Sequence, residues 1–127
     1  MHHIAARVRD FDAALAFYTT GLGFTPKIEW GAGEGRAAML DIGDGTCLEL
    51  FAGGAADDKP EGAVLHVALR TTDCDAALQR AVAAGAVMTM APTDIEIPSR
   101  PAPACVRIAF CKTPSGETVE FIQSADV

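Results

Sequence analysis

The chain has 127 residues, half of them hydrophobic, which is enough for one domain with a buried core. Its 17 acidic and 10 basic residues give a net charge of −7, which disfavours nucleic acid and anionic membranes as partners. No apolar run approaches the roughly 20 residues that cross a bilayer, and the N-terminus has no secretion-signal pattern, so we expect a cytoplasmic protein. The cysteines lack Cys-x-x-Cys spacing, and we expect free thiols at Cys47, Cys74, Cys105 and Cys111.

The first half of the chain predicts one helix among four strands. Residues 3–8 form a short run, bounded by a turn-forming aspartate, that we interpret as a strand. Asp10 can cap a helix that continues through Tyr18 and stops at Gly21 and Gly23. Further strands are expected at 24–30, 36–42 and 46–51. The first two of these are separated by a Gly-rich loop, and the last two by the Gly43-Asp44-Gly45 turn.

The second half repeats this order after a polar, Gly-rich linker at 53–62. We expect a helix at 73–84, ended by Gly85, and strands at 64–70, 86–90, 106–112 and 118–123; a Pro-rich loop spans Pro92 to Pro103. The predicted fold class is therefore α+β. Two tandem βαβββ modules, about 1–53 and 63–127, supply eight strands to a single domain covering residues 1–127.

An internal repeat supports this division. The thirteen residues from His3 to Leu15 match those from His66 to Leu78 at eight positions, all at an offset of 63. Such self-similarity fixes the architecture and pairs residues that would otherwise look isolated.

The repeat continues at a second offset. Residues 44–51 match residues 115–122 at an offset of 71, and Arg36 falls on Arg107 in the same frame. Both copies end in Gly-x-x-x-Glu, at Glu49 and Glu120. The eight extra residues of the second copy fall between Leu78 and Arg107, and the Pro-rich stretch is the expected place for them.

The duplicated chemistry is one histidine and one glutamate per copy. A single glutamate in an apolar strand often points to water, but equivalent glutamates in a repeat would meet the two histidines near a pseudo-twofold axis. Like charges brought together there need a cation. Two imidazoles and two carboxylates suit Ni²⁺, Co²⁺, Zn²⁺, Mn²⁺ or Fe²⁺ with open positions for substrate, which indicates a catalytic site. His2 competes with His3, but the seven-residue spacing to Asp10 repeats that from His66 to Asp73 and favours His3.

Two segments resemble the vicinal-oxygen-chelate superfamily, which includes glyoxalase I, extradiol dioxygenases, epimerases and bleomycin-binding proteins. The first is His3 to Asp10 followed by Ala16-Phe-Tyr-Thr-Thr-Gly-Leu-Gly-Phe24, and the second is Thr113-Pro-Ser-Gly-Glu-Thr-Val-Glu-Phe121. The resemblance implies that the paired modules form a U-shaped, mostly antiparallel eight-stranded sheet around a divalent metal ion. It also implies a homodimer, because proteins of this resemblance are commonly dimers. The implied metal ligands are His3, Glu49, His66 and Glu120.

This ligand order looks most like glyoxalase I. The implied activity is that of a metal-dependent lyase or isomerase acting on a vicinal-dioxygen small molecule, such as the hemithioacetal of a 2-oxoaldehyde and a thiol. Glu120 is expected to remove a proton, giving a metal-stabilised enediolate, and Glu49 to return or exchange it. The alternatives are a ring-cleaving dioxygenase, an epimerase of the same superfamily, or a non-catalytic drug-binding protein.

Substrate contacts are harder to predict. Arg7 and Arg70 lie four residues after the two histidines on the same strand face, so either could meet an anionic group; equally, each could cover the end of the sheet and pair with an acid. Arg100 could close over the site from the Pro-rich loop. Cys47 shares a face with Glu49, although a packed core thiol is the more common role.

Overall fold

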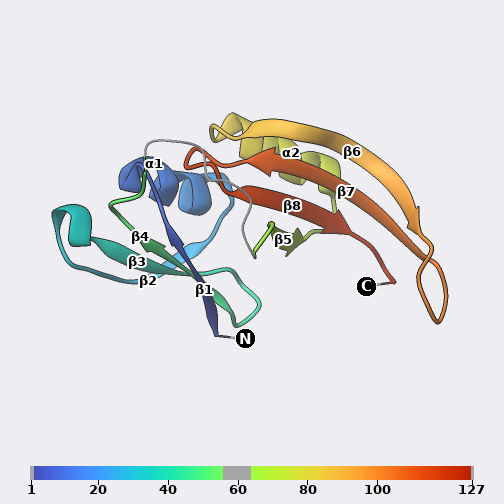
Figure 1. Ribbon diagram of the computed structural model, residues 1–127, viewed down its shortest axis with the longest axis horizontal. Helices are drawn as coiled ribbons and strands as arrows, with labels where there is room; N and C mark the ends of the chain where they lie inside the picture. Colours follow the sequence, from blue (N-terminus) through green and yellow to red (C-terminus); the bar gives the residue numbers. More distant parts are fainter. Residues whose placement is uncertain (1, 56–63, 127) are drawn as a thin grey trace. The chain divides into compact units, whose positions relative to one another are not determined.

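The computed structural model describes residues 2–55 and 64–126, and most of the expected linker lies outside these residues. The chain divides into two compact units (Figure 1). Unit 1 comprises Met1–Pro60 with Pro114–Gly116, and unit 2 comprises Glu61–Thr113 with Glu117–Val127. The strands of residues 2–55 and 64–126 form two four-stranded sheets, one in each unit.

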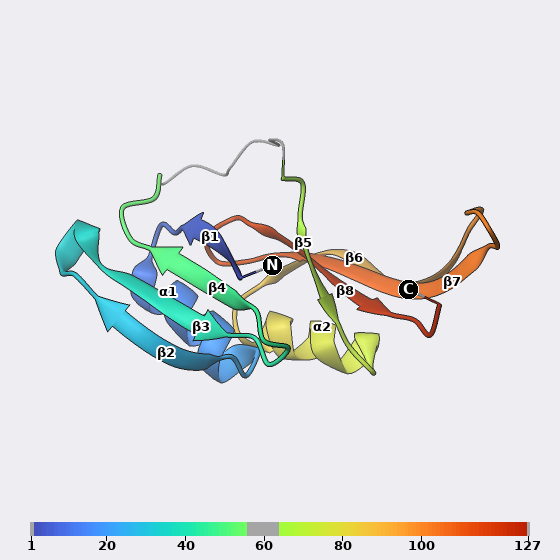
Figure 2. The same ribbon diagram turned by 90° about the horizontal axis from the view of Figure 1, so that it is seen from below.

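The sheet of unit 1 is mixed. Its strands follow the order β1-β4-β3-β2, in which β1 runs parallel to β4 and the other two pairings are antiparallel (Figure 2). These strands are β1 (His3–Arg7), β2 (Thr25–Trp30), β3 (Ala37–Asp41) and β4 (Cys47–Phe51). Side chains alternate between the two faces of the sheet. Leu40, Leu48 and Leu50 are buried on the face that packs against helix α1 (Phe11–Ala16).

The helical segment of unit 1 is longer than α1 itself. A π-helical turn, η1 (Phe17–Gly21), continues it, and Phe17 and Tyr18 of this turn are core residues. A short 3₁₀ turn, η2 (Gly33–Gly35), occupies the predicted Gly-rich loop between β2 and β3.

Unit 2 repeats this topology. Its strands follow the order β5-β8-β7-β6, and β5 is parallel to β8. They are β5 (Val67–Arg70), β6 (Val87–Ile97), β7 (Ala104–Lys112) and β8 (Thr118–Gln123). Helix α2 (Cys74–Ala83) covers one face, where Leu78, Cys111, Val119 and Phe121 are buried.

Both helices begin with the predicted aspartate cap. Asp10 accepts a hydrogen bond from the backbone N–H of Ala13 at 3.0 Å, and Asp73 accepts one from Ala76 at 2.9 Å. Each satisfies a backbone donor that the first helical turn leaves free. At the other end of α2, Gly85 adopts φ 101°, a left-handed conformation that glycine enters without steric cost.

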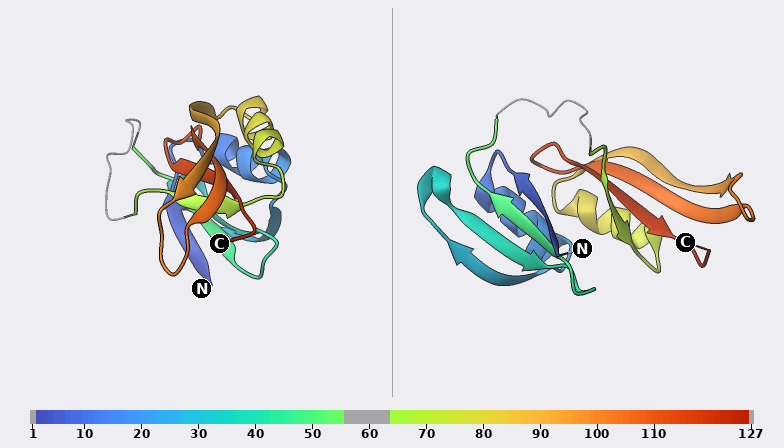
Figure 3. Two further views of the ribbon diagram at one scale, coloured as in Figure 1. Left: turned by 90° about the vertical axis from the view of Figure 1, so that its right-hand side faces the viewer. Right: turned by 60° about the horizontal axis from the view of Figure 1, so that its bottom comes forward.

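The prediction of a Pro-rich loop from Pro92 to Pro103 was wrong in its extent. The strand expected at 86–90 continues to Ile97, so β6 runs through Pro92, and only residues 98–103 connect it to β7. Pro92 is tolerated because β6 is an edge strand and its pairing with β7 is irregular between Met90 and Thr93. The extra residues of the second copy therefore lengthen the β6–β7 hairpin (Figure 3).

All four cysteines are free thiols, as expected, and Cys105 alone among them is exposed. Burial raises the pKa of the Cys111 thiol to about 11. Among the described residues, no helix has the length and apolar character needed to cross a membrane.

Candidate metal centre

The two sheets place the repeated glutamates in the same register. Ala5 of β1 lies opposite Glu49 of β4, and Ala68 of β5 lies opposite Glu120 of β8. The two alanines differ by the first offset and the two glutamates by the second, so the sequence repeat is also a repeat of strand pairing. Both glutamates lie on the face of their sheet opposite the helix, which we call the open face.

Each glutamate lies beside the histidine of its own unit. The Nε2 atom of His3 is 3.5 Å from Oε2 of Glu49, and Nε2 of His66 is 3.0 Å from Oε2 of Glu120. The glutamate side chains are only 14% and 12% exposed, whereas the histidines are 39% and 37% exposed. In both units a largely buried carboxylate thus lies beneath a more accessible imidazole.

The imidazoles have different second contacts. Nδ1 of His3 lies 2.8 Å from Nδ1 of His2, and the two rings are arranged edge to face. The His66 ring instead packs edge to face on Phe110, with 5.4 Å between ring centroids. His2 precedes β1 and contacts the ring that faces Glu49, which gives it the position of a hydrogen-bonding support.

The donor atoms fit a metal ion in chemistry and spacing. Nitrogen and oxygen ligands that bind one ion at about 2.1 Å lie about 3.0 Å apart when they occupy neighbouring corners of an octahedron. The two histidine–glutamate separations, 3.5 and 3.0 Å, are close to this value. In residues 2–55 and 64–126 no three His, Cys, Asp or Glu side chains converge as possible ligands, so the donors occur in pairs, one pair per unit.

The three candidate arginines differ in their surroundings. The Arg7 guanidinium donates to the carbonyl of Ala52 at 2.8 Å and lies over the Phe51 ring, so it supports the end of its sheet. Arg70 is exposed and makes no hydrogen bond or ion pair to another described residue. Arg100 is at the tip of the β6–β7 hairpin, roughly 20 Å along β7 from the level of Glu120.

Cys47 shares the open face with Glu49 but is 4% exposed. Its Sγ lies 3.8 Å from Nζ of Lys27, which in turn pairs with Asp41 at 3.4 Å. The hydrogen bond to Asp41, and then the Cys47 sulfur, raise the pKa of Lys27 above its ordinary value. Cys47 is therefore a packed thiol.

A second contact that occurs once in each unit, an arginine–aspartate ion pair, was not predicted from the sequence. Arg36 bonds Asp12 at 2.6 Å, and Arg107 bonds Asp75 at 2.7 Å, so each arginine joins its sheet to the start of its helix. Each also reaches an acid on the edge strand, Glu29 in unit 1 and Asp94 in unit 2. The signal was present: the aspartates share the first offset and the arginines the second.

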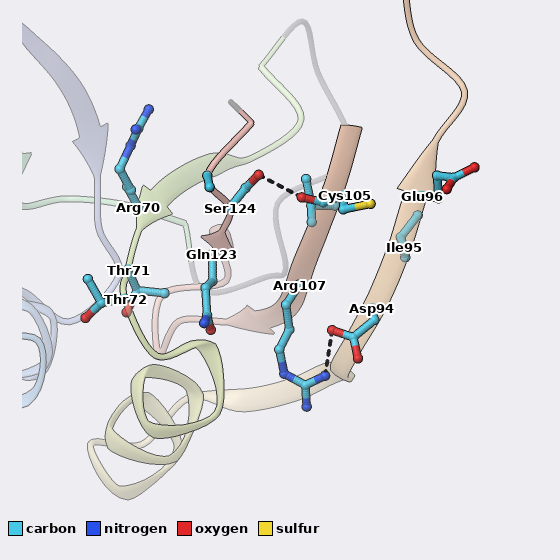
Figure 4. A pocket seen from close by; sticks show the side chains of 12 residues that line it. Arg70, Thr71, Thr72, Asp94, Ile95, Glu96, Cys105, Arg107, Gln123 and Ser124 are labelled. Atoms are coloured by element: carbon cyan, nitrogen blue, oxygen red, sulfur yellow. Dashed lines mark hydrogen bonds and ion pairs between the residues drawn. The ribbon is translucent and has the colours of Figure 1, made fainter. Parts of the chain in front are cut away.

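Unit 2 also contains a hollow of about 770 Å³ (Figure 4). It is bounded by Arg70, by Gln123 and Ser124 at the end of β8, and by the distal part of the β6–β7 hairpin. In Figure 4 the Arg107 side chain extends to Asp94 at its edge. Neither His66 nor Glu120 lines this hollow, so it is separate from the candidate metal ligands.

Comparison with known proteins finds relatives from one superfamily. The sequence model of the Glyoxalase/Bleomycin resistance protein/Dioxygenase superfamily matches residues 1–121. A probable lactoylglutathione lyase of Vibrio cholerae serotype O1 is 31% identical over 128 aligned residues, covering 96% of this chain and 88% of the relative.

Solved structures agree on the fold. A glyoxalase I mutant from Zea mays matches with a TM-score of 0.75 and 25% identity, covering 99% of this chain and 45% of that longer chain. The antibiotic-binding protein TnmS3 from a Streptomyces species matches with a TM-score of 0.73 and 23% identity over 98% of this chain and 95% of its own. Proteins with this fold therefore include both an enzyme and a binding protein.

Proposed function

Because the chain belongs to the Glyoxalase/Bleomycin resistance protein/Dioxygenase superfamily, we propose that it is a metal-dependent lyase or isomerase of the glyoxalase I type. The observation that carries this proposal is the duplicated histidine–glutamate pair, placed in identical strand register in both units. The similarity to a probable lactoylglutathione lyase supports the same reaction class. The two units act as one functional domain in this proposal.

His3, Glu49, His66 and Glu120 would together hold one divalent ion, with Ni²⁺, Co²⁺, Zn²⁺, Mn²⁺ and Fe²⁺ as candidates. The bound ion would supply Lewis acidity toward the two neighbouring oxygens of the substrate. The glutamates and neutral imidazoles balance its charge, which leaves the site able to accept an uncharged substrate head. Both carboxylates are largely buried, so they would meet the substrate with little competing water.

Proton transfer is assigned to the glutamates. Glu120 takes the proton from the carbon next to the substrate carbonyl, and Glu49 returns or exchanges it on the neighbouring carbon. Both carry an exposed alanine as strand neighbour, Ala68 and Ala5, so no large side chain stands beside either carboxylate in that direction. Arg70, exposed at the end of β5, is the cation best placed for an anionic part of the substrate.

Metal analysis of the purified protein, followed by an assay, tests this function. We expect about one divalent ion per chain. After chelation, readdition of Ni²⁺, Co²⁺ or Zn²⁺ should restore conversion of the hemithioacetal formed from methylglyoxal and a thiol. A protein that binds no divalent ion, or binds it but isomerises no 2-oxoaldehyde adduct, would sink the proposal.

The same preparation separates the competing functions. Oxygen consumption with a catechol and Fe²⁺ would indicate a ring-cleaving dioxygenase. Inversion of configuration at one carbon, with the substrate's constitution unchanged, would indicate an epimerase. A metal-free protein that retains a drug-like apolar ligand would indicate a binding protein, as for the Streptomyces structure. We expect a homodimer in solution, which size-exclusion chromatography with light scattering would test.

A further inference from the structure

The open face of unit 1 carries a group of rings one step beyond the histidine–glutamate pair. Arg7, Phe51, Ala37 and Trp30 lie side by side across β1, β4, β3 and β2, as the strand register requires. We call these four residues the aromatic row. Phe51 is two residues after Glu49 on β4, so the row and the carboxylate point to the same side of the sheet.

The aromatic row is held in place by its own contacts. The Trp30 and Phe51 rings meet edge to face, with 6.1 Å between centroids. The Arg7 guanidinium carbon lies 5.6 Å from the Phe51 centroid, and its Nη1 is fixed by the Ala52 carbonyl. Ala37, between the two rings, has no exposed surface. A ligand would therefore meet preformed rings and would spend little free energy on ordering them.

Trp30 remains 39% exposed, and Ile28, at the same level of the sheet as Glu49, is 57% exposed. A large apolar side chain left in water forgoes the free energy of burial, and grouped apolar exposure on a protein surface marks a contact surface. The group is continuous with the candidate metal ligands, which favours the substrate itself as its occupant.

We propose that the aromatic row selects substrates whose two-oxygen head carries a planar aromatic substituent. This inference rests on the proposed function, because His3 and Glu49 would fix the head. Glu49 and Phe51 are roughly 7 Å apart along the strand, a span that a ring bonded directly to the head can cover and a methyl group cannot. In unit 2 the row equivalent to Arg7 and Phe51 contains Arg70, Ile122 and Ile108, so these positions carry no aromatic ring.

The chain provides its own probe, because Trp30 is its only tryptophan. Mandelate and lactate make a matched pair of ligands: both present a hydroxyl and a carboxylate on neighbouring carbons, and they differ only in phenyl against methyl. In protein loaded with one divalent metal, we expect mandelate to change Trp30 fluorescence and to bind about tenfold more tightly than lactate. Equal affinities, or binding of mandelate without a change in Trp30 emission, would overturn the proposal.

Substitutions in the aromatic row test whether its rings cause the preference for mandelate over lactate. Trp30→Ala, followed by calorimetry, should remove most of the tenfold preference, and Trp30→Phe should restore part of it because a ring is retained. Ile97→Ala is a matched control, since Ile97 is 42% exposed and also lies on an edge strand. A preference that survives in Trp30→Ala, or is lost equally in the control, contradicts the assignment to the aromatic row. Phe51→Leu, checked for folding by circular dichroism, should behave as Trp30→Ala does.

The failures of the two proposals can be told apart. If the protein binds no metal, both proposals are wrong, because the metal would hold the two-oxygen head. If metal binds and restores turnover but phenyl and methyl ligands behave alike, the function stands and the aromatic inference is wrong.

Discussion

The two units repeat their coordination chemistry and differ in what surrounds it. The pairs Ala5–Glu49 and Ala68–Glu120 have the same register, and each glutamate contacts the histidine of its unit. Beyond the glutamate, unit 1 presents Trp30 and Phe51, whereas unit 2 presents aliphatic side chains and places its open-face ring, Phe110, against His66. In our two proposals, the repeated positions would hold the metal and the differing positions would recognise the substrate.

The largest expected effect, on kcat, distinguishes the two glutamates. Glu120→Gln should lower kcat by about 10²–10⁴, because it removes the assigned general base. Glu49→Gln should lower it less, since that residue returns the proton. Steady-state assays on metal-loaded proteins measure both values, with bound metal and circular dichroism as controls. Full activity in Glu120→Gln would contradict its role, and a larger loss in Glu49→Gln would exchange the two roles.

A smaller effect on metal affinity should distinguish the surroundings of His3 from those of His66. His2 hydrogen-bonds Nδ1 of His3, the ring nitrogen that does not face Glu49, and loss of such a support commonly weakens metal binding by about 10–100-fold. We expect His2→Ala to lie near the lower end, about tenfold, because His2 is exposed. The matched control is Leu65→Ala, at the position before His66 in unit 2. Competition with a chromogenic chelator gives both affinities, and equal values for the two variants would remove the supporting role of His2.

The smallest effect concerns the duplicated ion pairs. Hydrogen bonds from Arg107 lower the pKa of Asp75 below its ordinary value of 3.8, so the folded state favours the charged carboxylate. That stabilisation is present above the ordinary pKa and is lost as the pH falls through the lowered one. Asp75→Asn should therefore lower Tm by about 1–3 °C at neutral pH, with the difference closing below pH about 4.

Thermal melts from pH 7 downward, with Glu96→Gln as an exposed acidic control on β6, measure this dependence. A deficit in Asp75→Asn that does not shrink in acid would show that the aspartate acts through something other than its charge.

Much of the fold could be predicted because the sequence repeat let each predicted helix or strand be checked against its counterpart in the other copy. Asp10 and Asp73 marked both helix starts, and the two offsets implied the paired positions of Glu49 and Glu120. The family resemblance is confirmed by the match over residues 1–121. The four metal ligands and the catalytic roles stay predictions.

Other features could not be read from the sequence because they depend on packing between distant segments. Pro92 suggested a loop, and only the edge position of β6 makes it compatible with a strand. Trp30 ends the strand predicted at 24–30, and its contact with Phe51 arises from a register across three strands. Two ion pairs, Arg36–Asp12 and Arg107–Asp75, also went unpredicted. Their prediction would have needed the offset of 63 for the aspartates together with the offset of 71 for the arginines, and neither composition nor periodicity provides this combination.

The edge strands carry one more consequence. β2 and β6 each end their sheet, and each contains a proline beside an irregular step, Pro26 in β2 and Pro92 in β6. A proline offers no N–H, and a bulge bends the strand, so both features oppose the docking of another strand on the open edge. Nearby charges at Lys27 and Asp94 act in the same direction. The β2 edge and the β6 edge are thereby protected against edge-to-edge aggregation, in a chain half of whose residues are hydrophobic.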